Sequence, residues 1–140
     1  MWTKDCSVNV PASPDAVWAV LGDVAGWSRW NDGVESIELD GPVAVGTKFV
    51  MTPPGEDPIT SEIIELLDGE AITDRTDFQG LQIRVRHLLS ATATGSTTVT
   101  YHVEVTGDAP GEVMREVGEG ISADFPDVLA SLSAQVASQG

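Results

Sequence analysis

The stretch AITDRTDFQGLQIRVRHLL, residues 71–89, decides the fold, because it contains two strand-length runs joined by Gln79-Gly80. If these two residues form a hairpin loop, Phe78 pairs with Leu81 and pairing continues outward along both runs. One face of the hairpin is then mostly apolar and holds Ile72, Asp74, Thr76, Phe78, Leu81, Ile83, Val85 and His87. The other face is polar and holds Thr73, Arg75, Asp77, Gln82, Arg84 and Arg86. A shift of one residue would mix the two sets, so the pattern predicts this register.

The next run, Thr98–Thr106, extends the same sheet. Its apolar face consists of Val99, Tyr101, Val103 and Val105, which are expected to lie opposite the odd-numbered residues of the preceding strand. Pairing odd with odd positions requires a loop with an odd number of residues, such as Gly95 to Thr97. The second histidine, His102, is then expected on the face opposite to His87.

The rest of the chain is predicted to form further short helices and strands. Ser13-Pro14-Asp15 predicts the start of a short helix over Ala16–Leu21, and a second short helix is expected over Val24–Trp30. The strand-length runs, counted with those above, are Thr3–Val10, Val34–Leu39, Thr47–Thr52, Ile59–Leu67, Ala71–Phe78, Leu81–Ala93 and Thr98–Thr106. Short loops between such runs predict an antiparallel sheet.

After Gly111 the apolar residues change to helical spacing. They recur at steps of three and four, which predicts one long amphipathic helix: Met114, Val117, Ile121, Phe125, Val128, Leu132 and Val136. Pro126 removes a backbone donor, so a bend is expected near Phe125. The helix must cover one face of the sheet, and residues 1–140 therefore predict a single α+β domain.

Composition excludes several classes of function. Seven Lys and Arg against 22 Asp and Glu give a formal net charge of −15, which repels nucleic acid and anionic membranes. Cys6 is the only cysteine, so no intramolecular disulfide and no cysteine-based metal site is expected. No secretory signal or membrane-spanning run is visible, which favours a cytoplasmic protein, as a monomer or homodimer.

Three polar residues interrupt the apolar face of the sheet. Asp74 and His87 lie diagonally across the hairpin, and Tyr101 reaches the same region from the next strand. A buried carboxylate is unfavourable unless it is paired or its surroundings are wet. Two interpretations of Asp74 stay open, namely pairing with His87 or Tyr101, and a cavity that admits water.

Apolar and aromatic residues around this face are candidate ligand contacts. They are Trp27, Trp30, Phe49, Met51, Phe78, Met114 and Phe125. The alternative for Trp27 and Trp30 is a core role anchoring the short helices, which is more common for aromatic residues at helical spacing. No nucleotide-binding glycine motif or nucleophile elbow occurs, and the histidines lie on opposite faces, so neither cofactor nor metal is expected.

The segments VPASPDAVWAVLGDVAGWSRWNDGVESIELDGPVAVGTKF (10–49) and HLLSATATGSTTVTYHVEVTG (87–107) make the chain resemble a known family. It is similar to the START-like, or SRPBCC, superfamily, and most of all to small polyketide cyclase/dehydrase-type proteins. The resemblance runs from about Val8 to Val136. It implies the helix-grip fold, a seven-stranded antiparallel sheet around a long C-terminal helix with a cavity between them. Gly118 and Gly120 depart from the pattern, since they would loosen or break that helix.

Three functions are compatible with this reading. The leading one is binding of a hydrophobic small molecule, such as a polyketide, lipid or aromatic metabolite, in an elongated apolar cavity. The alternative is a polyketide cyclase or dehydratase without cofactor, in which Asp74 or His87 is the base and Tyr101 the donor to an enolate. The third is a protein-interaction domain with a filled cavity.

Overall fold

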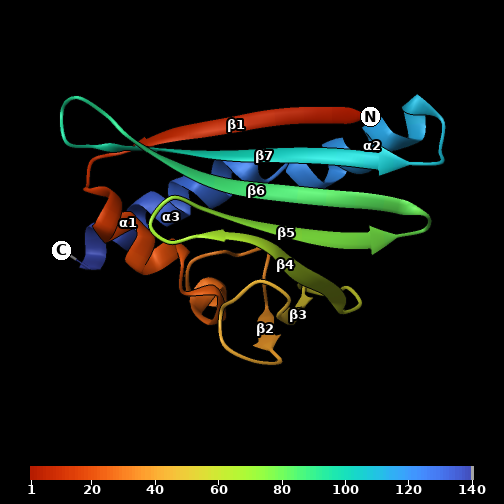
Figure 1. Ribbon diagram of the computed structural model, residues 1–140, viewed down its shortest axis with the longest axis horizontal. Coiled ribbons are helices and arrows are strands. Elements are labelled where there is room, and N and C mark those ends of the chain that lie inside the picture. The colour runs from red at the N-terminus through yellow and green to blue at the C-terminus, as the bar shows by residue number, and fades with distance from the viewer. Residues whose placement is uncertain (140) are drawn as a thin grey trace.

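The observed sheet has seven antiparallel strands in the order β1-β7-β6-β5-β4-β3-β2. The computed structural model describes residues 1–139, and its strands are β1 (Trp2–Val10), β2 (Ser36–Leu39), β3 (Lys48–Thr52), β4 (Ile59–Leu67), β5 (Ala71–Phe78), β6 (Leu81–Ala91) and β7 (Thr97–Gly107). Two helices, α2 (Gly111–Ser122) and α3 (Phe125–Gln139), run along one face of the sheet (Figure 1). This is the predicted α+β helix-grip architecture, and the two layers enclose the core between them.

The β5–β6 hairpin has the predicted register. Phe78 pairs with Leu81, Asp74 with Val85, and Ile72 with His87. The loop residues Gln79 and Gly80 have φ angles of 49° and 82°. Positive φ at both positions is what a two-residue turn between twisted strands requires, and it fixes which side chains face the helices.

The β6–β7 pairing confirms that odd-numbered residues face odd-numbered residues. His87 lies opposite Tyr101, and Leu89 lies opposite Val99. The connecting loop is longer than the one predicted at Gly95–Thr97, because Ala91 and Thr97 are already the last pair. The sheet face is unaffected, since the loop of residues 92–96 also has an odd length.

The C-terminal helix consists of two consecutive segments. Helix α2 ends at Ser122 and α3 begins at Phe125, so the bend expected near Phe125 is confirmed. Gly118 and Gly120 do not break the helix, because both residues lie within α2. Gly118 is buried, and it supplies space for a neighbouring side chain.

Two short helices follow β1 and close one end of the core. In α1 (Pro14–Leu21) the Ser13 hydroxyl accepts a hydrogen bond from the Ala16 amide at 3.3 Å, as an N-cap does. The second, η1 (Val24–Arg29), is a 3₁₀ helix, and Trp27 within it donates from Nε1 to the Leu21 carbonyl at 2.9 Å. This bond ties η1 to the end of α1 and holds the indole in the core.

The core is continuous from the short helices to α3. Its largest fully buried side chains include Phe49, Leu21, Ile63, Ile72, Leu129 and Leu132. Within residues 1–139, no helix is long and apolar enough to cross a membrane.

Candidate functional site

Asp74, His87 and Tyr101 come together on the inner face of three adjacent strands. His87 on β6 lies directly between Ile72 on β5 and Tyr101 on β7, and Asp74 is diagonal to it. The exposed fractions are 9% for Asp74, 4% for His87 and 4% for Tyr101. The structure thus groups the three predicted polar residues, which we call the inner polar cluster.

His87 is held in a single tautomer. Its Nδ1 lies 2.9 Å from the Ile72 carbonyl oxygen, and because a carbonyl only accepts, Nδ1 carries the hydrogen. Burial lowers the pKa of His87 to about 4, although the Ile72 bond opposes this shift. The imidazole is therefore neutral at pH 7, with the lone pair of Nε2 free to accept a hydrogen bond.

The Asp74 side chain supplies the one carboxyl group of the inner polar cluster. Burial raises its pKa to about 7. Neither Asp74 nor the Tyr101 hydroxyl makes a side-chain hydrogen bond within the described chain, yet every fully sealed side-chain nitrogen or oxygen there has a partner. The oxygens of both residues, and Nε2 of His87, therefore border space that a water molecule can reach.

A second carboxylate approaches the cluster from the helical layer. The pKa of Tyr101 is raised by burial and then by the charges of Asp74 and Asp124. Asp124 lies between α2 and α3, and burial also raises its own pKa. A Cβ on Gly33 would lie 2.9 Å from its Oδ2, so Asp124 packs against that loop. Sequence analysis missed Asp124, although the break before Pro126 marked its position.

A chain of rings passes through the cluster. Phe49 and Trp27 have centroids 6.1 Å apart, and Trp27 and His87 are 5.1 Å apart. His87 meets Tyr101 edge to face at 4.5 Å, and Tyr101 meets Phe125 in the same way at 5.3 Å. Three of the predicted ligand contacts, Trp27, Phe49 and Phe125, thus surround the polar groups.

The other predicted contact residues have different places. Met114 is buried in the core, Met51 is partly buried against it, and Trp30 is buried beside η1. Phe78 shares the inner face by register but is 47% exposed, because it lies at the tip of the β5–β6 hairpin. Phe78 therefore lies at the exposed end of the inner face, away from the inner polar cluster.

Two hollows of the described structure lie away from the inner polar cluster. One, of about 110 Å³, lies between η1 and the end of α3 and includes Trp30 in its wall. The other, of about 290 Å³, is an open depression at the hairpin tip beside Phe78. Neither is lined by a residue of the inner polar cluster, so the elongated apolar cavity stays a prediction.

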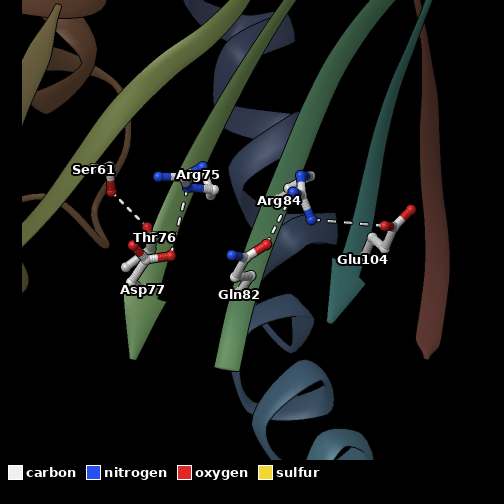
Figure 2. A network of polar contacts seen from close by, with 7 residues as sticks. All are labelled: Ser61, Arg75, Thr76, Asp77, Gln82, Arg84 and Glu104. Atoms are coloured by element: carbon white, nitrogen blue, oxygen red, sulfur yellow. Dashed lines mark hydrogen bonds and ion pairs between the residues drawn. The ribbon is translucent and has the colours of Figure 1, made fainter. Parts of the chain in front are cut away.

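The outer face of the sheet carries the arginines expected there. Figure 2 shows Arg84 bonded to Gln82 at 3.0 Å and paired with Glu104 at 3.9 Å, and Arg75 paired with Asp77 at 3.5 Å. Arg86 pairs with Glu65 at 2.9 Å. His102 is also outside, bonded to Asp5, so the two histidines lie on opposite faces as predicted. In residues 1–139, no group of three or more metal-binding side chains is found.

A seven-stranded antiparallel sheet that grips C-terminal helices is the helix-grip fold. The chain belongs to the family described as polyketide cyclase / dehydrase and lipid transport, whose model matches residues 1–137. No sequence among curated proteins matches the chain.

Solved structures with the same fold have low sequence identity to the chain. The Zhui aromatase/cyclase from Streptomyces sp. R1128 is 18% identical with a TM-score of 0.78, covering 96% of this chain and 93% of that one. Norcoclaurine synthase from Thalictrum flavum, in complex with dopamine and hydroxybenzaldehyde, is 17% identical with a TM-score of 0.78, covering 99% and 88%. A START superfamily protein from Mycobacterium smegmatis is 13% identical with a TM-score of 0.74, covering 99% of each chain.

Proposed function

We propose that this protein binds a hydrophobic small molecule between the sheet and the C-terminal helices, with the inner polar cluster orienting it. The observation that carries the proposal is three polar side chains, each at least nine-tenths buried, with unpartnered atoms facing one region. These atoms border space that water can reach, so a ligand with matching hydrogen-bonding groups can take the place of that water.

The surroundings of the cluster favour a ligand with a ring. Trp27, Phe125 and the ring of Tyr101 offer edges and faces to an aromatic or alicyclic molecule. Family membership supports the ligand classes polyketide and lipid. Because neither hollow reaches the cluster, we expect a ligand of polyketide size to displace core side chains as it enters.

A neutral apolar fluorophore tests the binding function. N-phenyl-1-naphthylamine should gain fluorescence with the protein, and Trp27 emission should change because its ring lies 5.1 Å from His87. His87→Gln and Asp74→Asn should shift the affinity, whereas the outer-face control Arg84→Ala should not. Absence of binding by this probe and by a broad apolar library would leave the protein-interaction domain as the better reading.

A second candidate is a polyketide cyclase or dehydratase, and the environment of Asp74 supports it. A carboxyl with a pKa of about 7 is suited to general-base work at neutral pH. Asp74 would take a proton α to a carbonyl, and Tyr101 would donate to the enolate oxygen. The α-carbon then bonds to a second carbonyl carbon of the same chain, whose oxygen takes up the proton held by Asp74 and becomes a hydroxyl. Asp74 then removes a second proton from the same α-carbon, and the hydroxyl leaves with that proton as water, which forms a carbon–carbon double bond.

Turnover separates the two candidates. For a cyclase, Asp74→Asn should lower turnover of a poly-β-keto substrate by about 100-fold or more while binding persists. For a carrier, the variant changes affinity only and no product forms with either protein. Equal turnover by the wild type and both the Asp74 and His87 variants would remove these residues from any catalytic role.

A further inference from the structure

The interior of this protein contains a carboxyl, that of Asp74, but no lysine or arginine. None of the seven Lys and Arg residues, all of them within residues 1–139, is buried. Three of the arginines are held in ion pairs on the outer face of the sheet. Asp74, in contrast, is concealed beside Tyr101, and Asp124 acts on the same hydroxyl. A negative charge near Tyr101 thus has no counter-charge from the protein.

The open hydrogen-bonding positions of the cluster are mostly acceptors. His87 uses its only N–H on the Ile72 carbonyl, which leaves Nε2 as an acceptor. An ionised Asp74 accepts at both oxygens and donates nothing, so the Tyr101 hydroxyl is the one donor of the cluster. A ligand group that fits must therefore mainly donate. An ammonium group donates three hydrogen bonds and also brings the missing positive charge.

The rings around the cluster suit a cation as well. Trp27, Tyr101 and Phe125 are linked through His87 in a continuous series of ring contacts, and the face of an aromatic ring attracts an ammonium most strongly when both are desolvated. A carboxylate or phosphate on the ligand would instead face Asp74 with no basic partner nearby. Like charges in a poorly hydrated interior repel strongly.

Building on the proposed binding function, we infer that the interior site selects a ligand carrying a protonated amine next to an aromatic ring, and discriminates against anionic ligands. The amine is the group that lies at Asp74 and His87, and the ring of the ligand packs among Trp27, Tyr101 and Phe125. The chemical class is thus an aromatic amine rather than a fatty acid or an acidic polyketide.

Three probes that share a phenyl ring test this selection: phenethylamine, 2-phenylethanol and 3-phenylpropanoate. At pH 8, titration calorimetry should give phenethylamine at least a tenfold lower Kd than 2-phenylethanol, with 3-phenylpropanoate weakest. Asp74→Asn should abolish the advantage of the amine over the alcohol, and a circular dichroism spectrum like that of the wild type shows that the variant is folded. The matched control Asp77→Asn changes an acid of the same strand on the outer face, and it should keep the advantage.

The number of protons released when phenethylamine binds gives an independent test. The titratable groups around the site are Asp74, His87, Tyr101 and Asp124, and burial raises the pKa of Asp74 to about 7, so that Asp74 is close to half-protonated at pH 7. An ammonium stabilises its ionised form, so phenethylamine should release protons at pH 7, seen as a buffer-dependent binding enthalpy. Asp74→Asn should release fewer protons than the wild type.

The outcomes separate this inference from the proposed function. If 2-phenylethanol binds as tightly as the amine, or 3-phenylpropanoate binds more tightly, the inference is overturned while the binding function stands. If Asp74→Asn and Asp77→Asn reduce the affinity advantage of the amine equally, the preference comes from the overall charge of −15. That result would also overturn the inference. If neither these probes nor N-phenyl-1-naphthylamine bind, the proposed function itself fails.

Discussion

The indole of Trp2 on β1 packs against the backbone of Gly118 in α2. A Cβ added to Gly118 would lie 2.2 Å from both Cε3 and Cζ3 of that indole, which is far inside van der Waals contact. The glycine therefore gives the first strand room to pack on the helix. Gly120, two residues further on, has nothing within 4 Å of the same position.

These two glycines give a matched pair of substitutions. Gly118→Ala should lower the free energy of unfolding by about 1–3 kcal/mol, since overpacking outweighs the gain in helix propensity. Gly120→Ala should raise it by up to about 1 kcal/mol, because only the propensity changes. Urea denaturation measures both. Trp2→Ala should reverse the loss in Gly118→Ala, and an additive double variant would show that the two residues do not contact.

The pH dependence of stability should show two opposing contributions. The pKa of His87 is lowered from 6.5 to about 4, so its contribution is present above pH 6.5 and falls by about 3 kcal/mol as the pH drops to 4. The pKa of Asp74 is raised from 3.8 to about 7, so its contribution is present below pH 3.8 and falls by about 4 kcal/mol as the pH rises to 7. The wild-type profile should thus be nearly flat between pH 4 and 6.5.

Single substitutions should separate these two contributions. In Asp74→Asn, the free energy of unfolding should rise with pH from 4 to 6.5, because only His87 remains. In His87→Gln it should fall from pH 4 to 7, because only Asp74 remains. Denaturation midpoints across this range, with Arg84→Ala as the control, measure the slopes. Identical profiles in both variants would contradict the burial of this pair.

The two faces of β6 should respond differently to substitution. Val85 lies directly opposite Asp74, so Val85→Asp places a second carboxylate beside a concealed one and should unfold the domain or cost at least about 3 kcal/mol. Arg84→Ala removes a half-exposed pair with Glu104 and should change stability by no more than about 0.5 kcal/mol. Thermal unfolding compares them, and reversed effects would mean that the strand faces the other way.

The protein should need helices α2 and α3 to avoid aggregation. Removing residues 111–140 would expose the apolar inner face that α2 and α3 cover, including Ile72, Ile83 and Val103. Such a patch favours association, so the truncated chain should aggregate in light scattering. A monomeric truncation that unfolds cooperatively would show that the helices are an appendage.

Local patterns were sufficient to predict the sheet and the inner polar cluster. In residues 71–89, strict alternation and a two-residue turn leave one register, and that register places Asp74, His87 and Tyr101 together. The bend near Phe125 followed from Pro126, because proline acts on the backbone next to it.

Features that depend on distant parts of the chain were not predictable in this way. The space that Gly118 provides is explained only by Trp2, at the other end of the sequence. Phe78 has the right alternation for an inner residue, but the hairpin tip carries it out into solvent. The influence of Asp124 on Tyr101 arises from how the helices cross the sheet, which no local pattern encodes.

The strand order determines when the sheet can be completed during synthesis of the chain. β1 pairs with β7, so that Trp2 lies opposite Val105, while β2 forms the other edge of the sheet. The first strand to leave the ribosome therefore has no partner until nearly the whole sheet has been synthesised. The hairpins from β2 to β7 can form as neighbours, but β1 must wait for a contact of very long sequence separation, which slows folding. Until then β1 remains unpaired, and this exposed strand leaves the nascent chain vulnerable to aggregation for most of its synthesis.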